Sequence, residues 1–359
     1  MKSKIYYYLS LSLSLFILCS CTDSKSKKRV SSVSMGILTH NIIDLGEIFI
    51  GYGGRLVVYK DTIIGMEAPN SSMPPFFCLK PNEELPSFYY FGNKGQGPND
   101  FLQPYSIQHI ENNIIGTWDI NARMYYEFAL PDEKKEVSID KRVRFEVILL
   151  SRVIKTAYNQ FIALMMADDE AMFLLADSTG KTVNTFFEYP YRNNDERQRF
   201  NNRARFSAYQ GELATNPSKT KFVYASDKGE IIHFYDIENN NIKPIVKIEK
   251  EYALYENREI PGGGTGVQLG TEGMRGYVSI YATEQFVYAL FSGKKVGETN
   301  SRAAHTLRIF DWNGNNVKEY ELDVPSLYLC VSDDDSKLWA IATNPDPELV
   351  YFNLKNPNN

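Results

Sequence analysis

A short apolar run followed at once by a turn recurs along this chain, and this repeat constrains the fold more than any other feature. The clearest copies are Met172–Asp177, Ile232–Asp236, Leu307–Asp311 and Leu349–Phe352. Turn residues follow the first three copies, for example Asn313-Gly314. Such pairs favour tight hairpins because they tolerate positive φ. The repeat therefore predicts a series of small antiparallel sheets.

Each copy lies in a group of short predicted strands. The predicted strands are 62–68, 76–80 and 87–92; 114–119, 124–130 and 136–140; 161–166, 172–177 and 182–189; 222–226, 231–237 and 243–248; 287–292, 306–312 and 317–322; and 337–343 and 349–354. A further apolar segment precedes most groups, at 106–110, 147–154, 276–281 and 327–331. Four strands in each of six repeats predict an all-β, six-bladed β-propeller. Because an open array of sheets would leave exposed edges, we expect an early strand within 42–50 to complete the last blade.

The stretch 91–107 connects the first predicted blade to the second, and it carries a family resemblance. Its centre, Gly95-Gln96-Gly97-Pro98-Asn99-Asp100-Phe101, resembles a Gly-x-Gly-Pro-x-acid-Phe element of the TolB-like six-bladed β-propeller lipoproteins, and NHL repeats have a similar turn. Residues 275–283 and 286–293 resemble the fifth blade of that family. Asn99 stands where glycine is more usual. The resemblance covers nearly all of the mature chain and implies the same fold.

The N-terminus has the features of an export signal. Lys2 and Lys4 precede the uncharged apolar run Ile5–Leu18, which is too short for a comfortable membrane span. Leu18-Cys19-Ser20-Cys21 follows and resembles the lipobox of bacterial lipoproteins. The resemblance implies that Cys21 is the acylated first residue of the mature protein, and two or more acyl chains give stable anchoring. We favour this over a secretory signal with a chance cysteine.

These segments predict the domain organisation and the location of the protein. Residues 1–20 form the signal peptide, 21–36 a flexible tether, and 37–359 the propeller. The tether is rich in Ser and Lys, and we favour a solvated linker over contact with anionic lipid head groups. Asp23 is the one acidic residue close behind Cys21. We therefore expect a lipid anchor in a Gram-negative envelope, at the outer membrane and facing the periplasm.

The net charge argues against one class of partner. The formal net charge is −5, and removal of Lys2 and Lys4 with the signal peptide makes it more negative. An acidic chain without a dense basic stripe argues against nucleic acid as a partner.

Cys78 and Cys330 would lie in the first and last blades. Although a bridge between them is conceivable, we favour two buried, unpaired thiols.

Two predicted loops have compositions that could suit a ligand-binding site. The stretch 192–205 holds five arginines and could bind an anion, but nearby acidic residues favour a solvated excursion between blades. The glycine-rich stretch 261–266 lacks the Lys-Ser/Thr ending of a phosphate loop, so we interpret it as a mobile loop at the rim of the channel.

No metal or cofactor is predicted. Asp311–Asn315 and Asp333–Asp335 could suggest calcium, but both stretches suit hairpin turns. The histidines His40, His109, His233 and His305 are far apart in the sequence, and we expect His233 to be a structural residue.

The sequence thus predicts a binding or scaffold module rather than an enzyme. Its partner would be an unknown protein or a small-molecule or glycan ligand over the central channel, where loops of several blades meet. The candidate ligand-binding residues flank predicted inner strands: Arg205, Tyr209, Arg275 and Tyr277. The alternative is a propeller hydrolase or lyase with a cation in the channel. A third hypothesis is an accessory lipoprotein for nutrient uptake or envelope signalling.

Overall fold

The structure is a computed structural model that describes residues 35–48, 50–81, 86–133, 136–166, 171–260 and 264–354. The chain divides into two units, residues 1–32 and 33–359, and every described residue belongs to the second. The predicted signal peptide, Cys21 and most of the predicted tether lie outside the described residues. Strand β1 comprises Met35–Leu38. Its first two residues therefore belong to the range 21–36 that the sequence assigns to the tether. Within the described part, no helix has the length and apolar character needed to cross a membrane.

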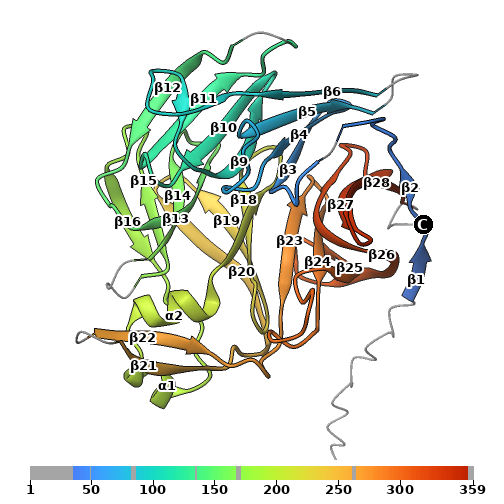
Figure 1. Ribbon diagram of the computed structural model, residues 1–359. Coiled ribbons are helices and arrows are strands. Elements are labelled where there is room, and N and C mark those ends of the chain that lie inside the picture. Colours follow the sequence, from blue (N-terminus) through green and yellow to red (C-terminus); the bar gives the residue numbers. More distant parts are fainter. Residues whose placement is uncertain are drawn as a thin grey trace, which may run out of the picture. The chain divides into compact units, whose positions relative to one another are not determined.

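Four blades are separate four-stranded antiparallel sheets in which chain neighbours pair (Figure 1). Their strands are β3 (Leu56–Tyr59), β4 (Thr62–Met66), β5 (Phe76–Lys80) and β6 (Ser87–Phe91); β9 (Pro104–Glu111), β10 (Ile114–Asp119), β11 (Met124–Ala129) and β12 (Ile139–Arg144); β13 (Leu150–Lys155), β14 (Phe161–Met165), β15 (Phe173–Ala176) and β16 (Thr182–Phe186); and β17 (Gly211–Thr215), β18 (Lys221–Ser226), β19 (Glu230–Glu238) and β20 (Asn241–Glu251).

The remaining two blades share one strand and so form a single large sheet. Its main path runs through β23 (Tyr277–Ala282), β24 (Phe286–Phe291), β25 (Ala304–Asp311), β26 (Asn316–Val331), β27 (Lys337–Thr343), β28 (Pro347–Asn353) and β2 (Asn41–Ile42). The first half of β26 pairs with β25, and its second half, from Ser326, pairs with β27. β26 is therefore the outer strand of the fifth blade and the inner strand of the sixth.

The inner strands form a closed ring. Each contacts the next in the cyclic order β3, β9, β13, β17, β23, β26 and back to β3. The buried side chains agree, because the described residues form six apolar cores and each core joins two neighbouring blades. Phe76 of the first blade meets Phe128 of the second with ring centroids 5.6 Å apart, and Leu56 and Trp339 share the core between the first and sixth blades. The six-bladed propeller predicted from the sequence is confirmed.

An early strand completes the last blade, as predicted, but it is shorter than the expected range. Asn41 and Ile42 of β2 pair with Tyr351 and Val350 of β28, and Ile43 N donates to the Leu349 carbonyl at 2.9 Å. The rest of the predicted range, up to Ile50, is not in a strand where it is described. Strand β1 adds to β26 in parallel, which the sequence did not indicate.

The glycine-rich stretch 91–107 anchors the second blade. Gly97 N donates to Asp100 Oδ2 at 2.8 Å, and a Cβ on Gly95 or Gly97 would collide with the Asp100 carboxylate. This tight turn places Phe101, which is fully buried, edge-on against Phe76 at 5.0 Å between ring centroids. The sequence motif therefore has a structural role, because its turn packs the second blade against the first.

Two insertions depart from the regular blades. The arginine-rich stretch predicted as a solvated loop instead forms two helices, α1 (Asn194–Arg199) and α2 (Asn202–Tyr209). The side chains of Asn193 and Asn201 cap them by accepting hydrogen bonds from the backbone N of Glu196 and Ala204. The second insertion is the hairpin β21 (Tyr255–Ile260) and β22 (Gly264–Leu269). It contains the end of the predicted glycine-rich loop 261–266, of which 261–263 lie outside the described residues.

Cys78 and Cys330 are free, buried thiols, as favoured by the sequence. Cys78 lies in the core between the first and second blades, and Cys330 lies in the core between the sixth and first.

Candidate functional site

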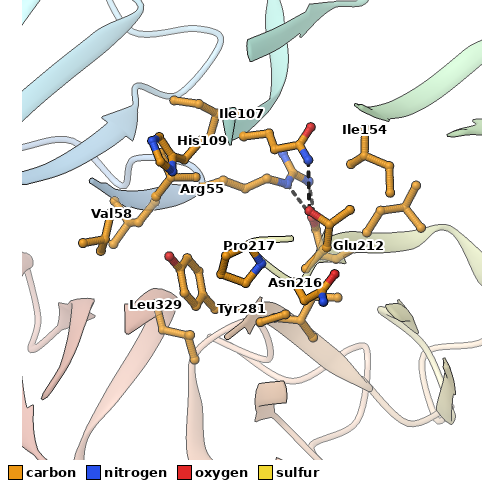
Figure 2. Close-up of a pocket in the computed structure, with 18 of the residues that line it drawn as sticks. Arg55, Val58, Ile107, His109, Ile154, Glu212, Asn216, Pro217, Tyr281 and Leu329 are labelled. Carbon is orange, nitrogen blue, oxygen red and sulfur yellow. Dashed lines mark hydrogen bonds and ion pairs between the residues drawn. The ribbon is translucent and has the colours of Figure 1, made fainter. Parts of the chain in front are cut away.

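A cavity of about 90 Å³ lies on the axis of the ring, and every inner strand lines it (Figure 2). One lining residue from each inner strand in turn is Val58, Ile107, Ile154, Ala214, Tyr281 and Leu329. The wall is mixed, because polar side chains such as Gln108 and Ser279 lie inside the inner strands among these apolar residues. Polar residues border it towards the ends of the inner strands, among them His109, Asn216 and Asp333. Among the described residues, no group of three or more His, Cys, Asp or Glu side chains is placed to hold a metal ion.

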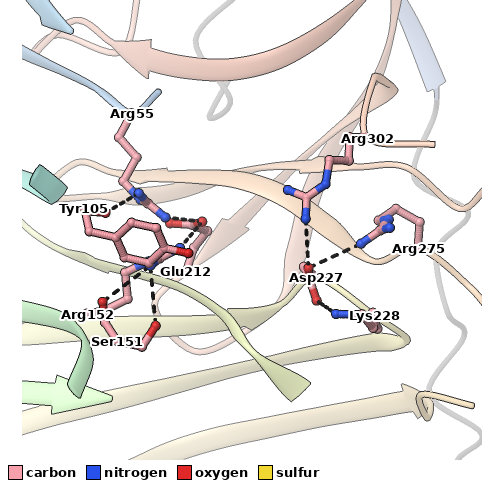
Figure 3. Close-up of polar contacts among 9 residues, drawn as sticks. All are labelled: Arg55, Tyr105, Ser151, Arg152, Glu212, Asp227, Lys228, Arg275 and Arg302. Carbon is pink, nitrogen blue, oxygen red and sulfur yellow. Dashed lines mark hydrogen bonds and ion pairs between the residues drawn. The ribbon is translucent and has the colours of Figure 1, made fainter. Parts of the chain in front are cut away.

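An arginine–glutamate cluster lies where the inner strands begin, and we call it the clasp: Arg55, Arg152, Glu212 and Tyr105 (Figure 3). Arg55, directly before β3, donates through two nitrogens to the two carboxylate oxygens of Glu212 on β17. Arg152 of β13 donates to Glu212 Oε1 at 3.2 Å. Its guanidinium also lies 4.0 Å from the centroid of the Tyr105 ring on β9. The clasp thus connects four of the six blades.

The electrostatics of the clasp favour the ionised glutamate. Burial by itself would raise the pKa of Glu212, but the charges and hydrogen bonds of Arg152 and Arg55 outweigh it and lower the pKa to about 2. Glu212 in turn raises the pKa of Arg55 against the opposing effect of burial. Two cations to one anion leave the clasp with a net charge of +1 at neutral pH.

A second charged group lies at the same end, and we call it the Asp227 cluster: Asp227, Lys228, Arg275 and Arg302 (Figure 3). One Asp227 carboxylate oxygen lies 2.7 Å from Lys228 Nζ. The other lies 3.3 Å from Arg275 and 3.6 Å from Arg302. Three cations therefore surround one carboxylate.

The backbone shows why the two clusters share one end of the ring. Asp227 follows β18, and its N donates to the carbonyl of Gln210, the residue before β17. Gly276, directly before β23, donates its N to the Asp227 carbonyl. Glu212 is the second residue of β17. The Asp227 cluster and the clasp thus lie at the starts of the inner strands, and we call this end the mouth.

The two insertions are also at the mouth, because each connects an outer strand to the inner strand of the next blade. A hollow of about 650 Å³ lies between α1 and the β21–β22 hairpin. Glu196 is on its wall and accepts hydrogen bonds from the hydroxyls of Tyr209 and Tyr255 at 2.9 and 2.7 Å. These contacts fasten α1 to α2 and to the hairpin.

The structure separates the four residues that the sequence nominates for ligand binding. Arg205 and Tyr209 are buried in α2, where Arg205 donates to Glu188 at 3.0 Å and Tyr209 donates to Glu196. Arg275 is in the Asp227 cluster at the mouth. Tyr277 is buried on β23, and its hydroxyl lies 3.4 Å from Arg308. The hydrogen bonds of Arg205 and Tyr209 thus fix the helices in place, whereas Arg275 is surrounded by charged side chains.

Other polar residues that the sequence singled out have structural partners. Asp311 Oδ1 accepts hydrogen bonds from the N of Asn313 and Asn315, which makes a hairpin turn as favoured. Asp334 bonds Ser332 and Ser336 in another turn. His233 is 1% exposed and lies 2.9 Å from Glu249 through Nε2, so it is a structural residue as expected.

The family of the chain follows from its sequence match and this geometry. Residues 35–334, from the first residue of β1 to a point just before β27, match the family described as TolB-like 6-blade propeller-like. The chain belongs to this family. The resemblance drawn from the Gly95–Phe101 stretch is thereby confirmed.

Two solved structures are similar to this TolB-like chain. One is a protein of Bacteroides fragilis NCTC 9343 described as exported, at 13% identity and a TM-score of 0.52, with 91% of this chain and 98% of that chain covered. The other is the calcium-binding protein regucalcin of Agrobacterium tumefaciens C58, at 10% identity and a TM-score of 0.49, with 89% and 95% covered. No curated protein matches the sequence. At this identity, the likeness to the Bacteroides fragilis protein shows the fold alone.

Sequence reasoning missed most of the TolB-like propeller's charged mouth. Its further members are Arg55, Arg152, Glu212, Asp227, Lys228 and Arg302. Glu212 gave no usable signal, because its strand β17 is only partly buried and has a weak apolar pattern. A signal was present in Arg152, a charged residue inside a short strand that is otherwise largely buried. Such a residue needs a partner, but only the fold brings Arg55 to Glu212.

Proposed function

We propose that this protein is a lipid-anchored binding module of the bacterial envelope that takes its partner at the mouth of the propeller. The observation that carries the proposal is the mouth itself. The first residues of all six inner strands lie at this end of the propeller. The two helices, the β21–β22 hairpin and two charged clusters lie there as well. Sites formed by several converging loops on a rigid scaffold are typical of binding surfaces.

The anchor and the location rest on the sequence. The Leu18–Cys21 motif supports acylation of Cys21, and the TolB-like family is typically associated with the periplasm and envelope, which supports an envelope location. The outer membrane and its periplasmic face are part of the proposal. The partner is a protein or a small-molecule or glycan ligand, and nucleic acid is not expected for an acidic chain.

The anchor is tested by the Cys21→Ser variant. We expect the wild-type protein in the membrane fraction of its native host or of a Gram-negative host, and the variant in the soluble periplasmic fraction. Mass spectrometry of the wild-type N-terminal peptide should show acyl groups on Cys21. A wild-type protein that is soluble, or unmodified at Cys21, would refute the anchor.

The binding site is tested by a photo-crosslinking amino acid placed at either end of the propeller. Thr299 is exposed in the β24–β25 connection at the mouth, and Asn239 is exposed in the β19–β20 turn at the opposite end. We expect light-dependent adducts of defined mass from position 299 in native cells, and none of that mass from position 239. Equal adducts from both positions, or adducts from 239 alone, would refute binding at the mouth.

A further inference from the structure

The Asp227 cluster holds more buried positive charge than its carboxylate can balance. Lys228 and Arg275 have side chains that are 4% and 9% exposed, whereas the Arg302 side chain is 66% exposed. Counted as ionised side chains, the three cations and Asp227 have a formal net charge of +2. Placing unbalanced like charges in a partly desolvated site is costly unless a counter-charge is supplied.

The pKa shifts of Lys228 and Arg275 have the direction that a shortage of negative charge produces. Burial is the largest cause that lowers the pKa of Lys228, and Arg275 and Arg302 lower it further, against the opposing attraction of Asp227. Burial and Arg302 likewise lower the pKa of Arg275, although Asp227 opposes them. One carboxylate is therefore not enough to offset burial and the mutual repulsion of three cations.

The cluster also contains a hydrogen-bond donor that lacks a partner. Arg275 Nε is buried and has no hydrogen-bond acceptor among the described residues. A buried N–H without an acceptor is rare, because leaving it unpaired costs the desolvation of that group. In the neighbouring clasp, Arg152 Nε is also buried without an acceptor. Charge and hydrogen bonding thus both call for an acceptor with negative charge.

The charge of the mouth is opposite in sign to that of the whole chain. The clasp and the Asp227 cluster together contain five cations and two carboxylates, a net charge of +3, in a chain whose formal net charge is −5. Attraction of an anion towards a positive region of an acidic protein depends on this local excess and not on the overall charge.

We propose that the Asp227 cluster binds an oxyanion, either a phosphate or a carboxylate group of the ligand. Arg302, the exposed member, contacts the anion from the solvent side, and Lys228 and Arg275 provide the buried donors. Arginine suits this task because its planar fork matches the oxygens of both groups. Asp227 positions the three cations. This inference rests on the proposed function and names the chemistry of the group taken at the mouth.

The test uses the full mature chain made soluble by Cys21→Ser, with inorganic phosphate and citrate as separate probes in isothermal titration calorimetry. We expect at least one probe to bind with a stoichiometry of one. Arg302→Gln and Arg275→Gln should each weaken that binding at least tenfold. Arg144→Gln, at an exposed arginine of outer strand β12, should leave it unchanged. Saturation by phosphate alone identifies a phosphate group, and saturation by citrate alone identifies a carboxylate.

The inference is overturned if neither probe saturates, or if both glutamine variants bind as tightly as the Arg144 control. Because Arg302 is exposed, its variant remains informative even where Arg275→Gln impairs folding. Crosslinking at position 299 without anion binding would leave the proposed function standing and remove the oxyanion. Anion binding without crosslinking at position 299 would leave the oxyanion site standing and remove the proposed function.

Discussion

Replacement of Glu212 by Gln should lower the free energy of unfolding at pH 7 by about 3–5 kcal/mol, because it leaves one buried and one mostly buried arginine without their counter-charge. The Glu212 side chain is 14% exposed, and those of its partners Arg55 and Arg152 are 18% and 10% exposed. Solvent can therefore do little to replace the lost carboxylate. The measurement is denaturant unfolding of both proteins at equal ionic strength.

The matched control is the same substitution at Glu272, whose side chain is 72% exposed and pairs with Lys295 at 2.6 Å. Exposed ion pairs contribute little to stability, so Glu272→Gln should leave the free energy of unfolding almost unchanged. Equal effects of the two substitutions would mean that the clasp does not hold the blades.

The clasp also predicts a pH dependence. The pKa of Glu212 is about 2 in the folded protein and 4.5 is its ordinary value, so the unfolded chain takes up this proton first as the pH falls. The contribution of Glu212 is therefore complete above about pH 4.5 and is lost between pH 4.5 and 2, at a size of about 3 kcal/mol. Over this range the stability of the wild-type protein should approach that of Glu212→Gln. A constant difference between the two proteins down to pH 2 would contradict this assignment.

Ring closure by the early strand gives the second large effect, and two adjacent isoleucines allow a matched test. Ile43 is 7% exposed in the core between the sixth and first blades, whereas Ile42 is 58% exposed. Ile43→Ala should destabilise the protein by about 2–4 kcal/mol through lost burial and an incompletely filled core. Ile42→Ala should cost less than about 1 kcal/mol.

Thermal unfolding of the two alanine variants measures this difference directly. We expect a clear fall in the midpoint temperature for Ile43→Ala and a small change for Ile42→Ala. If the two midpoints were the same, residues 41–43 would not be closing the ring.

The regular part of the propeller could be predicted because its strands are apolar runs bounded by turn residues. Strands β5, β10 and β27 have the bounds that the sequence predicts. Inner strands β3 and β17 were not assigned. Gly211–Thr215 contains Glu212 and only two large or medium apolar residues, Leu213 and Ala214, so its apolar pattern is weak. Strand β26 also continues through Pro325, where the sequence suggested a break.

The insertions and the charged mouth depend on contacts that no local pattern reveals. Helix α2 buries polar residues such as Asn202 and Arg205 along with Ala208 and Tyr209, so it lacks the apolar stripe that marks a surface helix. Its stability comes from the Asn201 cap and from tertiary contacts instead. Likewise, Arg55 and Glu212 are far apart in the sequence and meet only because the first and fourth blades face the same channel.

Binding of an oxyanion at the mouth can be observed by anomalous diffraction from crystals of the protein soaked in tungstate. Tungstate is a phosphate-like oxyanion with a strong anomalous signal. We expect a peak within hydrogen-bond distance of Lys228 Nζ and of the Arg275 or Arg302 guanidinium. Tungstate bound only at other basic side chains, with no peak at the Asp227 cluster, would contradict it.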